Sequence, residues 1–194
     1  MIKVGLTGGI GCGKSVVADI LRIHNIPVYE SDQEAKRLMQ NSATIRANLT
    51  SLMGEEAYID DKLNRNFVAS LVFDNPYLLE NLNAIVHPEV ISDFVNWSAA
   101  QSSSIVVVES AILFESGLAT QLHKIITISS PEEIRVARTM ARDKLTLEQV
   151  HKRIDAQMTD EERSQLSDFV VINDNKQAII PQINIILASL QGLK

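Results

Sequence analysis

A short stretch near the N-terminus combines the residue types that bind a phosphate chain. It reads GGIGCGKS from Gly8 to Ser15 and matches G-x-x-x-x-G-K-[ST] without a mismatch. In this pattern, glycines let successive N–H groups point at phosphate oxygens, and the following helix adds its positive dipole end. We expect Lys14 to reach the β- and γ-phosphates and Ser15 to hold Mg²⁺. The alternative is a glycine-rich turn that contains Lys-Ser by chance, but the strand-like run before it and the helical pattern after it disfavour that.

Two carboxylates follow apolar runs that we expect to be buried strands. Asp32 comes just after Ile26–Tyr29, at the end of a strand where parallel sheets bind their ligands. It could orient or deprotonate an attacking hydroxyl, or it could instead cap a helix that starts near Gln33. Glu109 follows Ile105–Val108, where an acid could face Mg²⁺ or make a structural hydrogen bond.

Three arginines share one face of a predicted helix, because Arg135, Arg138 and Arg142 are spaced by three and four residues. Guanidinium groups there could form a lid that closes over a transferring phosphoryl group and excludes water. The segment 135–163 holds seven basic and six acidic residues. Since its charge nearly cancels, a solvated helix face is the alternative.

Three other residues each allow two interpretations. The pair His87-Pro88 is typical of a helix stop or turn and would end the helical stretch around it. Asn173 follows an apolar run and could read an adenine edge or begin a turn. Cys12 lies at a helix N-terminus, an environment that lowers a thiol pKa, so alkylation there would block ATP binding and MgATP would protect it. The alternative is a small residue tolerated for its size.

Five apolar runs predict the strands that position these groups. Because the runs are continuous and helical patterns separate them, they indicate a parallel sheet covered by helices on both faces. Capping signatures predict helix starts at Ser130, Thr146 and Thr159. The stretch of about 31–100 shows helical periodicity and no convincing strand, which predicts a helical insert after the second strand. The five runs are 2–7, 26–29, 105–108, 125–128 and 169–172.

Composition narrows the class of protein. The chain has 194 residues, 45% of them hydrophobic, and this favours one ordinary globular domain over a disordered chain. No apolar stretch approaches the ~20 residues of a membrane span, and no signal peptide is recognisable, so we expect a cytoplasmic protein with no membrane partner. The single cysteine excludes an internal disulfide, and a net charge of −6 disfavours nucleic acid as a partner.

Other short motifs favour a small-molecule kinase among phosphate-loop proteins. The D-x-x-G and N-K-x-D elements of GTPase switches and the L-S-G-G-Q signature of transporter ATPases are missing from the sequence. The whole chain resembles dephospho-CoA kinases through segments in the family's order and spacing. These are GLTGGIGCGKS at the start, ESD at 30–32, LNR at 63–65, LN-x-I-x-HP at 82–88, ESAILFESG at 109–117, R-x-x-x-R at 138–142 and DFVVIND at 168–174. Departures from the family pattern are Cys12 for serine, Val16 for threonine, Ala111 for proline and Glu30 for aspartate.

The resemblance implies transfer of the ATP γ-phosphate to the ribose 3′-hydroxyl of dephospho-CoA. It implies a three-layer α/β P-loop kinase fold with core 1–30 and 101–194, an acceptor-binding insert of about 31–100 and a lid of about 138–158. Lys14, Asp32, Arg138 and Arg142 would be catalytic, Arg65 and His87 would join Asp32 at the acceptor, and Ser15 and Glu109 would face Mg²⁺. Residues implied to contact ATP are Gly9, Gly11, Cys12, Gly13, Lys14, Ser15, Val16, Arg138 and Asn173.

We expect a monomer or weak homo-oligomer with dephospho-CoA as its small-molecule partner. Two other functions stay open from the residues alone. One is a kinase that acts on a nucleoside or nucleotide, and the other is a nucleotide-binding regulatory module without phosphoryl transfer.

Overall fold

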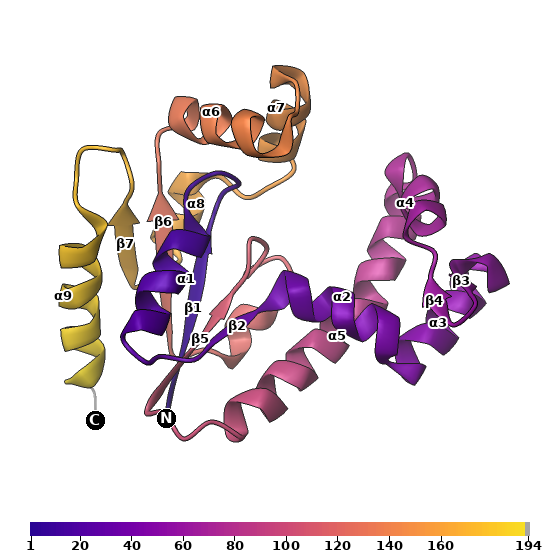
Figure 1. Ribbon diagram of the computed structural model, residues 1–194, viewed down its shortest axis with the longest axis horizontal. Coiled ribbons are helices and arrows are strands. Elements are labelled where there is room, and N and C mark those ends of the chain that lie inside the picture. The colour runs from indigo at the N-terminus through magenta and orange to yellow at the C-terminus, as the bar shows by residue number, and fades with distance from the viewer. Residues whose placement is uncertain (193–194) are drawn as a thin grey trace. The chain divides into compact units, whose positions relative to one another are not determined.

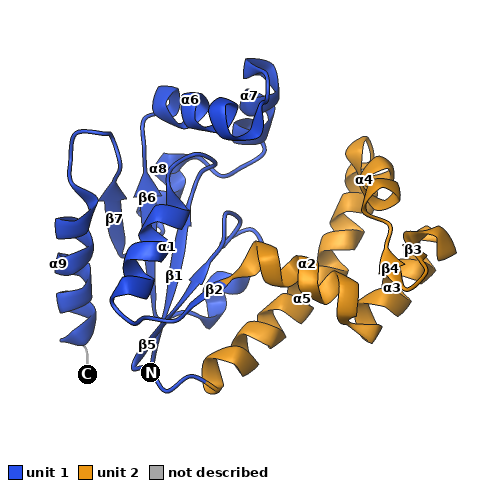
Figure 2. Cartoon of the chain, in the orientation of Figure 1, with its two compact units in different colours: residues 1–29, 101–194 blue, residues 30–100 orange. Residues whose placement is uncertain are grey.

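The computed structural model describes residues 1–192 and divides into two compact units (Figures 1 and 2). Residues 1–29 and 101–194 form the first unit, and residues 30–100 form the second. No helix within residues 1–192 has both the length and the apolar character that a membrane span requires.

A five-stranded parallel sheet organises the first unit, in the order β2-β5-β1-β6-β7. β1 pairs in parallel with both β5 and β6, and β6 pairs in parallel with β7. All five predicted strands are confirmed, although the second begins at Val28 and not at Ile26. The strands are β1 (Ile2–Gly8), β2 (Val28–Glu30), β5 (Ile105–Glu109), β6 (Lys124–Ser129) and β7 (Phe169–Ile172).

Helices cover the sheet and form a core with it. Residues of α1 and α9 pack with alternate residues of β1 and with β6, in a buried cluster that includes Leu6, Leu21, Ile126 and Ile183. On the opposite side of β1, leucine side chains from the segment after β5 lie close to Gly5. The helices of this unit are α1 (Lys14–Ile23), α6 (Glu132–Asp143), α7 (Leu147–Asp155), α8 (Asp160–Gln165) and α9 (Ile179–Gln191), with a short 3-10 helix η2 (Leu118–Gln121).

The helix starts agree with two of the three predicted caps. Thr146 and Thr159 each form a complete capping box with the glutamine or glutamate three residues later. The predicted cap at Ser130 is wrong, because α6 begins at Glu132 and Pro131 takes the cap position without a side-chain bond. The Ser130 hydroxyl is buried and has no hydrogen-bond partner among the described residues.

The second unit is predominantly helical, as the sequence predicts. Its elements are α2 (Ser31–Asn41), α3 (Ala43–Met53), η1 (Glu55–Ala57), β3 (Tyr58–Ile59), β4 (Lys62–Leu63), α4 (Arg65–Phe73) and α5 (Pro76–Ala99). β3 and β4 form a small antiparallel pair that the sequence does not reveal. Its turn residues, Asp60 and Asp61, both have positive φ. Aspartate tolerates this conformation, but Asp-Asp is a weaker hairpin signal than Asp-Gly.

The prediction that His87-Pro88 ends the helical stretch is wrong, because both residues lie inside α5. A proline removes one helix hydrogen bond, and here this loss is outweighed by a continuous apolar face. That face buries Leu82, Val86, Val90 and Phe94, at the four-residue spacing of one side of a helix. The alternative role of Asp32 as a helix cap is also wrong, since α2 begins at Ser31 and Asp32 lies within its first turn.

Candidate active site

The phosphate-binding stretch is a loop between the end of β1 and the start of α1. Gly13 caps α1 with a φ of 100°, which is a left-handed conformation that favours glycine. A Cβ atom at Gly13 would lie 2.4 Å from the Asn173 Nδ2 atom, so the position also has no space for a side chain. The first turn of α1 holds no acidic residue. The positive end of the helix dipole therefore remains available to an anion.

Lys14 reaches back across the loop that precedes it. Its Nζ atom donates to the Gly8 carbonyl at 2.9 Å and to the Gly9 carbonyl at 3.4 Å. These bonds hold the ammonium group at the loop, where it can contact a phosphate chain bound there. The next residue, Ser15, is exposed, so its hydroxyl is accessible to a ligand.

Asn173 and Arg138, two of the residues predicted to contact a nucleotide, meet at this loop. The buried Asn173 side chain donates from Nδ2 to the Cys12 carbonyl at 2.7 Å. Its Oδ1 atom accepts from Arg138 Nη2 at 3.1 Å. Arg138 also donates to the Gly11 carbonyl at 3.5 Å and to the Asn175 side chain at 2.5 Å. Asn173 therefore braces the loop, and its contact with adenine stays a prediction.

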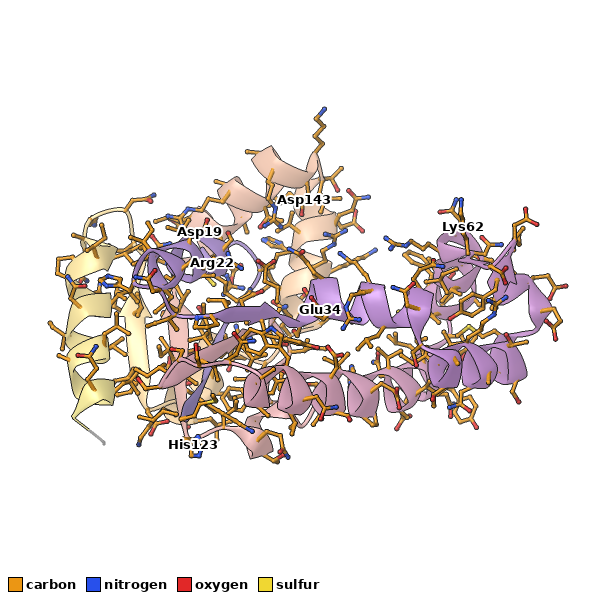
Figure 3. The ribbon with its side chains drawn as sticks, turned by 60° about the horizontal axis from the view of Figure 1, so that its bottom comes forward. Asp19, Arg22, Glu34, Lys62, His123 and Asp143 are labelled. Atoms are coloured by element: carbon orange, nitrogen blue, oxygen red, sulfur yellow. The ribbon has the colours of Figure 1, made fainter. Side chains whose placement is uncertain are left out.

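Arg142 has a different environment from Arg138, although both lie on α6. Its exposed guanidinium group donates from Nε and Nη2 to the carboxylate of Asp143, at 2.7 and 3.0 Å. Asp143 is labelled in Figure 3. These hydrogen bonds raise the pKa of Arg142 and lower that of Asp143. The structure thus places Arg138 at the loop, whereas Arg142 is paired with its neighbour in sequence.

Cys12 is completely buried within the loop. Burial raises the pKa of its thiol, and the nearby Lys14 charge opposes this only partly. The prediction of a lowered thiol pKa is therefore wrong, because loss of hydration dominates the charge and dipole effects on which that prediction relied. The prediction that Cys12 is readily alkylated, and that MgATP protects it, therefore loses its physical basis.

The loop has further partners. The sequence placed Arg135 on the face of the possible lid without a specific contact, and it missed Gln157, Asp160 and Arg163. Arg135 donates from Nε to the Ile10 carbonyl at 3.1 Å and from Nη1 to Asp160 Oδ1 at 2.9 Å. The Ile10 N–H donates to Gln157 Oε1 at 2.9 Å. Asp160 also binds Arg163, three residues later on α8. The three-residue spacing of Asp160 and Arg163 is a local signal for their ion pair. The bonds to Ile10 have no such signal, because they join residues more than a hundred positions apart.

Three of the other predicted residues lie in the second unit. Asp32, in the first turn of α2, and Arg65, the first residue of α4, are exposed. His87 is half-buried in α5, and this burial lowers the pKa of its imidazole. A neutral imidazole at pH 7 can donate one hydrogen bond and accept another.

The predicted magnesium contacts are a serine hydroxyl and one carboxylate. Glu109 is the last residue of β5 and lies opposite Leu6 of β1, two residues before the loop begins. Within residues 1–192, no three histidine, cysteine or acidic side chains gather into a metal cage. Mg²⁺ in phosphate sites is held by one or two protein groups, substrate phosphates and water, so Ser15 with Glu109 fits that chemistry without a cage.

Comparison with known proteins gives consistent matches along the chain. A family model described as dephospho-CoA kinase matches residues 2–178. A dephospho-CoA kinase from Bacteroides fragilis is 42% identical over 190 residues, which are 97% of this chain and 93% of the relative.

Solved structures agree with the sequence comparison. TT1252 from Thermus thermophilus is 36% identical, with a TM-score of 0.85 and 97% of each chain covered. Dephospho-CoA kinase from Campylobacter jejuni is 25% identical, with a TM-score of 0.73, and the match covers 99% of this chain and 98% of that one. The similarity thus includes the helical stretch as well as the sheet.

Proposed function

Because a family model and near-full-length relatives match it, the chain belongs to the dephospho-CoA kinase family, and we propose how its residues share the reaction. The enzyme transfers the γ-phosphoryl group of ATP to the ribose 3′-hydroxyl of dephospho-CoA and forms coenzyme A and ADP. The 3′-oxygen forms a new bond to phosphorus as the bond between the γ-phosphorus and the bridging oxygen breaks. Catalysis of such a transfer rests mainly on positioning and on stabilising charge.

The first unit binds the ATP phosphates. Backbone N–H groups of Gly9, Gly11 and Gly13 and the start of α1, including the exposed Val16, surround the phosphate chain, with Cys12 buried behind it. Lys14 exchanges its carbonyl partners for the β- and γ-phosphates. Arg138 and Asn173 lie beside the loop, from which they can contact the nucleotide. The observation that carries this proposal is the ammonium group of Lys14, held 2.9 Å from the Gly8 carbonyl at the dipole end of α1.

Magnesium fits the residues present at the loop. Ser15 offers an exposed hydroxyl, and Glu109 offers a carboxylate at the same end of the sheet. Bound Mg²⁺ would neutralise charge on the β- and γ-phosphates. Ser15 would hold the ion directly, and Glu109 would contact it or its water ligands.

The second unit binds dephospho-CoA. Asp32 accepts the proton of the attacking 3′-hydroxyl, a role for which an exposed carboxylate on a helix is accessible. Arg65 contacts the acceptor's phosphate groups, and neutral His87 offers hydrogen bonds to the acceptor nucleotide. Residues 30–100 are thus the acceptor-binding part of the kinase.

Residues of about 138–158 act as a lid. Arg138 already touches the loop, and Arg142 would exchange Asp143 for the transferring phosphoryl group when ATP is bound. Guanidinium groups stabilise the charge on that group, and closure excludes water that would otherwise hydrolyse ATP. We further propose a monomer or weak homo-oligomer that acts in the cytoplasm, with no nucleic acid as partner.

An assay of acceptors tests this function. Purified protein with MgATP is supplied with dephospho-CoA, a nucleoside or a nucleoside monophosphate, and ADP release is followed. We expect turnover with dephospho-CoA and at least 100-fold less with the others. Comparable turnover on nucleosides would overturn the acceptor assignment. Saturable ATP binding without ADP release on any acceptor would indicate a regulatory module.

A further inference from the structure

Two guanidinium groups lie against the phosphate loop and share a single carboxylate. Arg135 Nη1 and Arg163 Nη2 both bind the same oxygen, Oδ1 of Asp160. The side chains of Arg135 and Arg163 are 6% and 2% exposed, and that of Asp160 is 23% exposed. We call Arg135, Asp160 and Arg163 the triad. Its two cations and one anion give it a net charge of one positive unit, carried mostly by buried side chains.

The triad touches the loop at Gly9. A Cβ atom at Gly9 would lie 2.5 Å from Arg135 Nη2 and 2.9 Å from Arg163 Nη2, so both guanidinium groups lie close to Gly9 and leave no space for a side chain there. Arg135 also donates to the carbonyl of Ile10 at 3.1 Å. The two arginines thus lie beside the loop that binds the triphosphate. The sequence placed Arg135 on the face of the possible lid without assigning it a nucleotide contact, and it assigned no role to Arg163.

Arg163 carries an unusual electrostatic cost. It is the largest fully buried side chain among the described residues, and its Nε and Nη1 atoms have no hydrogen-bond partner there. A buried cation with unpaired donors destabilises a fold unless an opposite charge compensates it. The phosphate chain that the adjacent loop binds would supply that opposite charge.

The carboxylates near the triad do not cancel its charge. A cavity of about 490 Å³ beside Arg135 and Arg163 is also lined by Glu132, Asp155 and Glu161. These three residues are exposed, so water and salt screen them. The buried triad is screened far less, and its net charge acts on the loop.

We propose that Arg163 is a positioning residue for ATP: its buried charge, shared with Arg135 through Asp160, supports the phosphate loop and strengthens binding in proportion to the phosphates carried by the nucleotide. This inference rests on the proposed function, since it assigns the loop to ATP. Arg163 acts through the electrostatic field of its buried charge and through its support of the loop, and it need not touch the nucleotide. The charge of Asp160 opposes the same effect.

The test measures dissociation constants for MgATP, MgADP and AMP by calorimetry. In Arg163→Met, we expect ATP to bind about tenfold more weakly or worse, ADP to lose less affinity and AMP to lose least. Arg163→Lys keeps the charge and should stay within about threefold of wild type for ATP. Arg22→Met removes an exposed cation in the last turn of α1, with a side chain that is 39% exposed, and serves as the matched control with unchanged affinities.

Asp160→Asn separates charge from structure. Asparagine keeps the Oδ1 acceptor for both arginines but removes the negative charge, so ATP should bind at least about threefold more tightly. A purely structural triad predicts weaker binding in this variant. Circular dichroism and thermal melting show whether Arg163→Met folds. If Arg163→Met does not fold, ATP binding by Asp160→Asn tests the role of the charge.

The outcomes also separate this inference from the proposed function. Equal losses for ATP, ADP and AMP in Arg163→Met, or no loss, would overturn the role of Arg163. Unchanged or weaker ATP binding in Asp160→Asn would overturn it too. If the wild-type protein fails to bind MgATP, the proposed function itself fails, whatever the variants do.

Discussion

The two compact units hold their candidate residues in different ways. In the first unit, Lys14, Arg138 and Asn173 are tied to the phosphate loop by hydrogen bonds to its carbonyl groups. In the second unit, Asp32 and Arg65 are exposed on helices.

This difference indicates when each part of the reaction machinery is assembled. Residues 8–15 are already shaped by buried contacts, so binding ATP costs little rearrangement there. Exposed side chains such as Asp32 and Arg65 gain a fixed position only when a ligand binds them. Variants of the first unit should therefore act on ATP affinity, and variants of the second on turnover with the acceptor.

Of the variants described below, Lys14→Ala should impair the first unit most strongly. Loss of the ammonium group removes the main cation of the loop, so kcat/KM for ATP should fall by about 10³-fold or more. Steady-state kinetics measure kcat/KM for ATP, and labelled ATP measures binding. Lys36→Ala, which removes an exposed lysine of α2, is the control. Near-normal ATP binding by folded Lys14→Ala would contradict the assignment of the loop.

Asp32→Asn should lower turnover and leave ATP binding intact, because Asp32 lies in the second unit. Without a carboxylate to accept the proton, kcat should fall at least about 10²-fold while ATP affinity stays within about twofold. Steady-state kinetics and calorimetry measure the two quantities separately. Glu80→Gln, an exposed acid of α5, is the control. Unchanged kcat would remove Asp32 from the mechanism, and weaker ATP binding would break the division between the units.

Local sequence patterns predict most of this fold for clear physical reasons. Buried parallel strands need continuous apolar runs, and the runs at 105–108 and 125–128 are strands within a residue of their predicted ends. The error at Pro88 has an equally clear reason. The effect of proline on the backbone is local, whereas the packing of Val86 and Val90 that keeps α5 continuous depends on other helices.

The sequence predicts the part of the candidate site that lies in one short segment. It does not predict the part that forms where distant segments meet. The loop from Gly8 to Ser15 is such a segment. Arg135 and Gln157 hold that loop from more than a hundred residues away. The spacing of Arg135 from Arg138 and Arg142 predicts a shared helix face, but no local pattern predicts that Arg135 or Gln157 binds the loop. The pKa of Cys12 was mispredicted for the same reason, since burial depends on the whole fold.

A pH titration of stability tests the half-buried imidazole of His87 in the second unit. Burial lowers the pKa of His87 below its ordinary value of about 6.5, so the unfolded chain binds a proton at higher pH than the folded one. Its contribution to stability is therefore complete above about pH 6.5 and is lost as the pH falls toward the folded pKa. Thermal midpoints at pH 7.5 and 5.5 should differ less in His87→Gln than in wild type. His24→Gln, which changes an exposed histidine, should keep the wild-type difference.

Alkylation of Cys12 tests whether the loop from Gly8 to Ser15 keeps its structure without nucleotide. Because burial excludes reagent and raises the pKa of the thiol, iodoacetamide should leave Cys12 unmodified in the native protein, with or without MgATP. Mass spectrometry measures the labelling, and denatured protein supplies the fully labelled control. Rapid labelling that MgATP slows would mean that the loop opens without nucleotide. The first unit would then also assemble its site around a ligand, and the contrast with the exposed residues of the second would disappear.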